Sequence, residues 1–186
     1  MKTERGLGLV ELIIYSMLSI LVLAIVGGML INSLSAEGTV RDTTQSSNAG
    51  QLVAQSITQG IRNASSIQLV YPPTAGTQLL KARTVGSGSD PVWRCQAWYF
   101  GNGEVRVKTS SATIPTPVTP ADVATWTLLA DGVQKVPGKL VFALSGQRVD
   151  LEVEVSGNGG NAVRISTSAL SRQPVPVAVE SAPTCL

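Results

Sequence analysis

Hydrophobic positions are unevenly spread along this chain of 186 residues, and the longest apolar run lies near its start. The 20 residues 12–31 carry no charge, and the run continues to about Leu34. At 1.5 Å of rise per residue, such a helical stretch spans roughly 30 Å, the thickness of a bilayer core. Residues 7–34 are therefore predicted to form a membrane-spanning helix. Since no small-residue cleavage pattern follows the run, we expect this helix to stay attached.

The next stretch, residues 35–71, combines helical periodicity with a more polar composition. Between Ala49 and Ile67, apolar residues recur at steps of three and four, and no proline interrupts them. This spacing places them on one face of an α-helix. We expect the helix to continue here as an amphipathic half that packs on a sheet, until Pro72 and Pro73 end the region.

Beyond the proline pair the period changes to two, which is typical of β-strands. In residues 148–156, four aliphatic side chains alternate with three carboxylates, which indicates one buried and one solvated face. The predicted fold class is α+β, a long N-terminal α-helix packed on an antiparallel β-sheet. The β-rich domain covers residues 72–186 and ends in a proline-rich tail. Further strands are predicted at residues 92–100, 104–108, 126–129, 139–144 and 163–169.

Composition narrows the range of functions. Lys and Arg number 14 against 12 Asp and Glu, without a basic run, so nucleic acid is not an expected partner. Histidine is absent, which removes the commonest general base and the commonest metal ligand. We therefore predict that the protein is not an enzyme and uses no cofactor or metal. A membrane-anchored hydrolase that works without histidine is kept as an alternative.

Two groups of side chains have both a chemical and a structural interpretation. A carboxylate row at Asp150, Glu152 and Glu154 could bind calcium, but such a row along one strand is more often a solvated face. An aromatic cluster around Cys95 could stack on a carbohydrate, but core packing around a disulfide is the preferred interpretation. The cluster consists of Trp93, Trp98, Tyr99 and Phe100.

The chain has two cysteines, Cys95 and Cys185. If Lys2 and Arg5 stay in the cytoplasm, as the positive-inside tendency favours, the domain lies outside the cytoplasm, where thiols oxidise. We expect a disulfide between the two cysteines, with two separate thiols as the alternative. The enclosed loop of 91 residues would stabilise the fold by about 4 to 5 kcal/mol in the chain-entropy treatment.

The start of the chain resembles the cleavage and methylation signature of type IV prepilins and pseudopilins. The resemblance rests on a short charged leader that ends at Gly6, a hydrophobic Leu7, and Glu11 at the fifth position after that glycine. It implies that residues 1–6 are a leader peptide, which prepilin peptidase removes by cleavage between Gly6 and Leu7. It also implies N-methylation of the new amine of Leu7. Leu7 and Gly8 stand where family members often have Phe or Met and then Thr.

Glu11 is the central residue of this resemblance. A charge in the middle of an apolar span costs about 2.5 to 3.5 kcal/mol on insertion scales, so it needs a partner. The resemblance implies that Glu11 of an incoming subunit pairs with the Leu7 amine of a subunit already in a filament, which sets the axial register. The alternative is a boundary residue of a plain signal anchor that reaches into the lipid head groups.

Three small residues in the apolar segment are candidates for helix packing. Gly27 and Gly28 are adjacent and are predicted to kink the helix or to unwind one turn. Ala24 and Gly28 form a small-xxx-small pair, which allows the close approach of a second helix in lipid. We expect this part of the helix to contact neighbouring helices.

A more diffuse likeness covers the rest of the chain. The order of long helix, Pro72-Pro73, short strands and the segments 129–133 and 169–172 looks like the J-type pseudopilins of type II secretion and the related W-type minor pilins. This likeness implies a minor pilin or pseudopilin that initiates or caps a filament. The expected partners are prepilin peptidase, other major and minor pilins, a membrane platform protein with its assembly ATPase, and the lipid bilayer.

The resemblance also implies a location. The protein would cross the cytoplasmic membrane once, with its C-terminal domain outside the cytoplasm, and would then enter a cell-surface or periplasmic filament. A pilus, a secretion pseudopilus and a DNA-uptake filament are all compatible with the sequence. The alternative function is a single-pass anchor whose extracytoplasmic domain binds a ligand without entering a filament.

Overall fold

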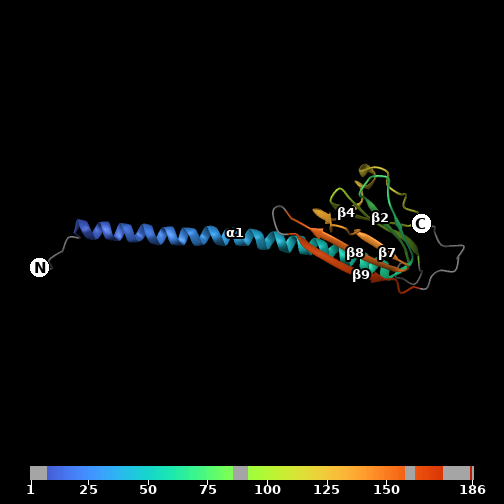
Figure 1. The fold of residues 1–186 in the computed structure, drawn as a ribbon, viewed down its shortest axis with the longest axis horizontal. Helices are drawn as coiled ribbons and strands as arrows, with labels where there is room; N and C mark the ends of the chain where they lie inside the picture. The colour runs from blue at the N-terminus through green and yellow to red at the C-terminus, as the bar shows by residue number, and fades with distance from the viewer. Residues whose placement is uncertain (1–7, 86–91, 158–161, 174–184, 186) are drawn as a thin grey trace. The chain divides into compact units, whose positions relative to one another are not determined.

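The computed structural model describes residues 8–85, 92–157, 162–173 and 185. These residues form one long helix, α1, nine β-strands and the short 3-10 helix η1 (Figure 1). The fold is α+β, as predicted, with α1 packed on antiparallel sheets. The chain divides into two compact units, residues 1–41 and 42–186. The predicted leader and most of the predicted proline-rich tail lie outside the described residues.

Helix α1 spans Leu9–Arg62, and its two parts differ in what they bury. Up to residue 41 the helix has no buried side chain, whereas in residues 42–62 buried positions recur at steps of three and four. One stripe of the second part therefore faces the core, as the amphipathic pattern predicted. The buried positions are Ser46, Gly50, Val53, Ile57, Gly60 and Ile61.

The predicted continuation of the helix to Ile67 is wrong, because α1 ends at Arg62. Strand β1, Ala64–Val70, follows at once and pairs antiparallel with β2, Gln78–Val85, a strand that the sequence did not predict. Ala64 and Ile67 contact the same core cluster as α1, so they satisfy a helical and a strand pattern alike. Pairing with β2 decides between the two, because the ladder satisfies the backbone groups of β1.

Five strands form the first sheet, in the order β1-β2-β3-β4-β5, and all neighbours are antiparallel. Strand β3 is Trp93–Gly101, β4 is Glu104–Ser110 and β5 is Thr127–Ala130. The β3–β4 hairpin turns at Asn102 and Gly103, whose φ angles of 52° and 77° are the left-handed values of a type I′ turn. The strands predicted at 92–100, 104–108 and 126–129 are confirmed to within two residues.

The second sheet is built around β8, Arg148–Val155. Strand β9, Val163–Leu170, pairs along one edge of β8. The other edge pairs first with β7, Phe142–Ser145, and then with β6, Val133–Lys135. The predicted strands at 148–156 and 163–169 are confirmed, the one at 139–144 begins three residues later than predicted, and β6 was not predicted.

The main core lies between α1 and the two sheets. Gly50 and Gly60 allow close approach here: a Cβ atom on Gly60 would lie 2.9 Å from Gln96 Oε1 and closer still to the ring of Trp98. The side chain of Trp98 is fully buried, and its indole N–H donates to Ser56 Oγ at 2.9 Å. A glycine on the helix and an indole on β3 thus set the contact between helix and sheet.

Replacing Gly60 by alanine should destabilise the domain, although alanine favours helix by about 1 kcal/mol. Overpacking against Trp98 costs typically about 1 to 3 kcal/mol, so after the gain in helix propensity we expect a net loss of up to about 2 kcal/mol. Urea unfolding followed by tryptophan fluorescence measures it. Gly38→Ala is the matched control, because no atom beyond the neighbouring residues and the local helix backbone lies within 4 Å of a Cβ at Gly38. Equal midpoints for the two variants would contradict the packing argument.

A second core cluster covers the other face of the first sheet. The connector that follows β4 contributes Ile114, Val123 and Trp126, which pack with residues of β2 and β3 and with Cys185. Arg106 of β4 holds the connector, because its Nη1 donates to the carbonyl oxygens of Ala124 at 3.2 Å and Trp126 at 3.1 Å. The connector is therefore part of the packed domain.

Asp122 organises the same connector from within η1, Pro120–Val123. Its Oδ2 accepts the backbone N–H groups of Thr119 and Val118, each at 2.8 Å. These hydrogen bonds, that of Thr119 first, lower the pKa of Asp122 below its ordinary value. The ionised carboxylate is the form that the folded chain favours.

Asp122→Asn should lower stability near neutral pH and lose this effect in acid. Because the folded pKa lies below the unfolded value of about 3.9, the ionised group stabilises the fold above that pH, and the stabilisation disappears as pH falls through the folded pKa. The urea midpoints of wild type and variant should therefore differ at pH 6 and converge as the pH falls through the folded pKa of Asp122. A constant difference over this range would contradict the assignment.

Candidate functional site

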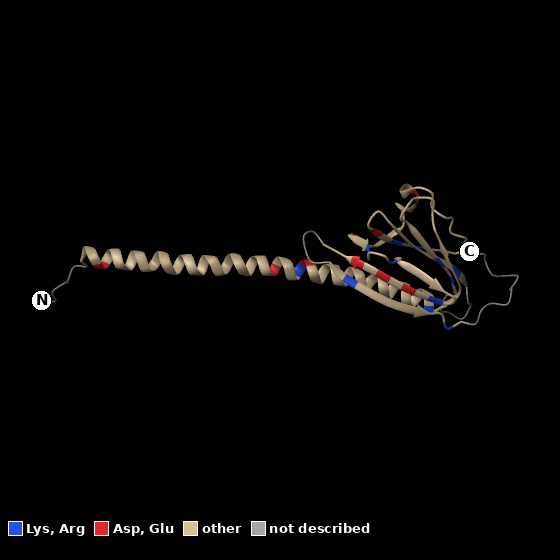
Figure 2. Ribbon diagram, in the orientation of Figure 1, with Lys and Arg blue, Asp and Glu red and all other residues tan. Residues whose placement is uncertain are grey.

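The N-terminal part of α1 has an apolar surface that nothing in its own unit covers. Every large apolar side chain from Leu9 to Leu34 is more than half exposed. This is the one helix in the described part of the chain that is long and apolar enough to cross a membrane. Figure 2 shows the stretch as a ribbon without charged residues between its first turn and the middle of the helix. A surface of this kind requires lipid or other apolar helices around it.

Glu11 is the one charge in this stretch, and it lies in the first turn of α1. Its backbone N–H donates to the carbonyl oxygen of Gly8 at 2.9 Å. Tyr15, one turn further along, donates its hydroxyl to Glu11 Oε1 at 3.3 Å. The carboxylate also lies near the positive end of the helix dipole, which stabilises an anion by about 0.3 to 1 kcal/mol. Gly6 and Leu7, the predicted cleavage and methylation positions, lie outside the described residues.

The predicted packing residues Ala24, Gly27 and Gly28 lie within the apolar stretch, in unbroken α-helix. The predicted unwound turn at the glycine pair is therefore wrong, because both glycines lie in continuous α-helix. The alternative, a kink at this pair, stays a prediction. No atom beyond the neighbouring residues and the local helix backbone lies within 4 Å of a Cβ at Gly27 or Gly28. The backbone at these positions is open to close contact by a second helix, which stays a prediction.

Two serine hydroxyl groups in and beside the apolar stretch donate to backbone carbonyl groups of the helix itself. Ser16 Oγ donates to the carbonyl oxygen of Ile13 at 2.8 Å, and Ser35 Oγ donates to that of Ile31 at 3.1 Å. Such back-bonding removes the need for water around these groups. Glu11 differs from them, because an ionised carboxylate needs donors that its own backbone turn does not supply.

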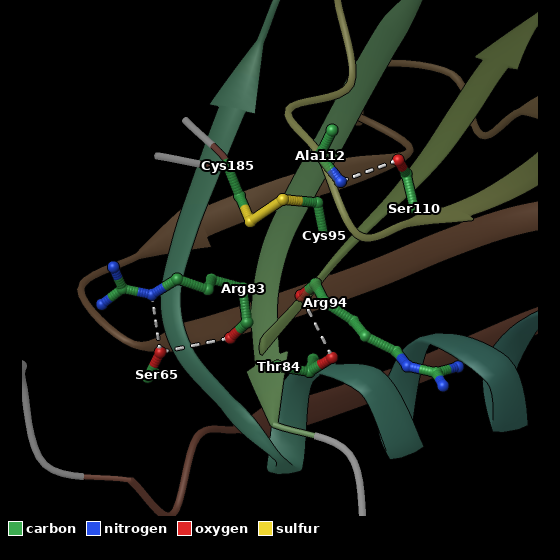
Figure 3. The surroundings of a disulfide bond; sticks show 8 residues. All are labelled: Ser65, Arg83, Thr84, Arg94, Cys95, Ser110, Ala112 and Cys185. Carbon is green, nitrogen blue, oxygen red and sulfur yellow. Dashed lines mark hydrogen bonds between the residues drawn. A yellow bond between two sulfur atoms is a disulfide. The ribbon is translucent and has the colours of Figure 1, made fainter. Parts of the chain in front are cut away.

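The disulfide between Cys95 and Cys185 is present, as predicted (Figure 3). The two Cα atoms lie 5.2 Å apart, 90 residues separate the cysteines, and both are about 1% exposed. The bond attaches the C-terminal end of the chain to β3. Beside it, Arg83 donates to Ser65 Oγ at 3.1 Å, which links β2 to the edge strand β1.

Of the four aromatic residues around Cys95, three lie in a hydrophobic core, and only Tyr99 packs around the disulfide as predicted. Tyr99 packs in the same cluster as the disulfide, with its ring 6.4 Å from that of Trp126 in an edge-on arrangement. Burial is the main cause that raises the pKa of Tyr99. Trp98 and Phe100 belong to the main core instead. Trp93 is partly exposed, with the guanidinium of Arg83 4.9 Å from its ring centroid.

The carboxylate row on β8 is a partly solvated, ion-paired face. Arg148 contacts Asp150 at 2.8 Å, and Glu152 pairs with both Arg164 and Lys139. The hydrogen bond with Glu152 raises the pKa of Arg164. Positive side chains thus neutralise Asp150 and Glu152, as expected of a solvated, ion-paired face. Within the described ranges, no group of three or more His, Cys, Asp or Glu residues is placed to hold a metal ion.

No protein-family model, curated protein or solved structure matches this chain. Its most unusual chemistry is the carboxylate at the start of an exposed apolar helix, followed by a domain closed by a disulfide.

Sequence reasoning missed three residues that organise these regions. Tyr15 was not singled out, although its position four residues after Glu11 places both on one helix face. Gly60 was not identified as a contact point, because its partner Trp98 is distant in sequence. Asp122 follows Thr119 by three residues, a capping spacing that a local search would have found.

Proposed function

We propose that this protein is a minor pilin or pseudopilin, a structural subunit that is processed by prepilin peptidase and assembled through its N-terminal helix. The observation that carries the proposal is a single carboxylate in the first turn of α1, at the start of an otherwise uncharged stretch whose large apolar side chains are all more than half exposed. A plain anchor needs the apolar residues but not the acid. A filament subunit needs both.

The acid and the apolar surface have complementary roles in this proposal. Cleavage after Gly6 frees the amine of Leu7, four residues from Glu11. In a filament, Glu11 of one subunit pairs with the Leu7 amine of its neighbour, which neutralises two charges that lipid disfavours. The apolar side chains exchange lipid for neighbouring helices, so extraction from the membrane has no large hydrophobic cost. Pairing then fixes the axial register between subunits.

The globular unit fits the same proposal as the part outside the cytoplasm. Its buried disulfide suits an oxidising compartment, and Lys2 and Arg5 favour a cytoplasmic N-terminus. We propose that the protein waits in the cytoplasmic membrane as a single-pass protein, and that a platform protein and an assembly ATPase move it into a filament. Its domain would then contact other minor subunits where the filament begins or ends.

The mass of the mature N-terminus tests the proposal. The full chain is co-expressed with prepilin peptidase, and the purified protein is digested and analysed by mass spectrometry. We expect loss of residues 1–6 and one methyl group on the amine of Leu7. Gly6→Leu is the matched control and should keep its leader. An intact wild-type leader beside an active peptidase would favour the alternative, a membrane-anchored domain that enters no filament.

A further inference from the structure

Tyr15 is a second polar group close to Glu11 within the apolar part of α1. Its hydroxyl donates to Glu11 Oε1 at 3.3 Å, and the two residues are one helical turn apart. Among the described residues, the other oxygen of the carboxylate, Oε2, has no hydrogen-bond donor from a side chain. We infer that Tyr15 is a positioning residue for Glu11, which holds one carboxylate oxygen and leaves the other free for the amine of a neighbouring subunit.

Both groups need this contact while the subunit is in lipid. A carboxylate and a phenol hydroxyl each lose water when the helix enters an apolar phase, and each is costly there without a partner. Side chains four residues apart on a helix lie on the same face, so the pair forms within one helix without any other molecule. The carboxylate thus stays satisfied before a filament partner is present.

The contact also fixes the direction of the carboxylate. A free glutamate side chain has several rotamers, and ordering it at the moment of docking costs conformational entropy. The hydrogen bond from Tyr15 selects the rotamers of Glu11 that keep Oε1 within reach of the phenol hydroxyl. This inference rests on the proposed function, because the bond that Tyr15 prepares is the one between Glu11 and the Leu7 amine.

A different explanation of Tyr15 makes a distinct prediction. Tyrosine is enriched at membrane interfaces, where its ring and hydroxyl suit the head-group level regardless of the helix face. A phenol at any nearby position would then serve equally well. A phenol that acts on Glu11 has to lie three or four residues from it.

The test compares incorporation of full-length variants into filaments in cells that supply prepilin peptidase and the assembly machinery. Tyr15→Phe keeps the ring and removes the donor, and one lost hydrogen bond should lower incorporation about fivefold at equal membrane level. Ile14→Tyr combined with Tyr15→Phe restores a phenol three residues from Glu11 and should recover most of the loss. Met17→Tyr combined with Tyr15→Phe places it about 120° around the helix and should not.

The outcomes separate the explanations. Loss in Tyr15→Phe with recovery by Ile14→Tyr alone supports the inference. Unchanged incorporation of Tyr15→Phe overturns it, and so does equal recovery by Ile14→Tyr and Met17→Tyr, which indicates an interfacial anchor. If the wild type itself is neither processed at Leu7 nor incorporated, the proposed function fails, and the inference that rests on it fails too.

Discussion

Glu11→Ala should leave the protein in the membrane and abolish its incorporation into filaments. The variant makes the span more apolar, so insertion is unaffected or improved. In the filament, however, the Leu7 amine of the adjacent subunit would be buried without its counter-charge. Removing one partner of a buried ion pair costs about 3 to 5 kcal/mol, which corresponds to a loss of more than a hundredfold.

The measurement is the ratio of protein in sheared filaments to protein in membranes, determined by immunoblot. Glu37→Ala is the matched control, because Glu37 is a carboxylate of the same helix beyond the uncharged stretch. We expect the control to assemble like the wild type. Undiminished incorporation of Glu11→Ala would remove the assigned role of this residue, and equal losses in both variants would indicate a general effect on the helix.

Of the substitutions considered, loss of the disulfide should lower the free energy of unfolding of the domain the most. Cys95 and Cys185 are 90 residues apart, and closing a loop of this length stabilises a fold by about 4 to 5 kcal/mol through the unfolded state. A whole domain is typically stable by only about 5 to 15 kcal/mol. Cys95→Ala combined with Cys185→Ala should therefore bring the full chain in detergent close to unfolding, as urea titration with tryptophan fluorescence measures.

Reduction of the wild type separates the crosslink from the packing of the sulfur atoms. Dithiothreitol opens the bond without changing side-chain volume, so the reduced wild type should lose nearly as much stability as the double variant. The double variant itself should not respond to dithiothreitol. A wild type whose urea midpoint is insensitive to reduction would show that the disulfide constrains a part of the chain that does not unfold with the domain.

Local sequence patterns were sufficient to predict an element wherever apolar residues recurred with one clear period, or without interruption, over a long segment. The uncharged run before residue 34 predicted an apolar helix, and the strict alternation around Leu151 predicted β8 with one wet face. The even number of cysteines and the expected oxidising compartment predicted the disulfide between Cys95 and Cys185. Each of these inferences depends on the chemistry of neighbouring residues or on a simple count, so no knowledge of distant contacts was needed.

Local patterns failed where distant residues compete for the same segment. Ala64 and Ile67 fit a helix as well as a strand, and the antiparallel pairing with β2 made them a strand. Gly27 and Gly28 have weak helix propensity, yet α1 continues through them, because each glycine costs a helix only about 1 kcal/mol relative to alanine. The helix propensity of a single residue is a small energy, and contacts with the rest of the structure outweigh it.

The sequence alone therefore determines that a carboxylate, Glu11, lies at the start of an apolar helix. It also determines the division into a helical and a β-rich part. They follow from periodicity, charge and length, which are local properties. Only the tertiary structure decides three other features. They are the contact of Gly60 with Trp98, the burial of both cysteines in one cluster, and the end of α1 at Arg62. They depend on side chains that are far apart in sequence and meet because the sheets close around the helix.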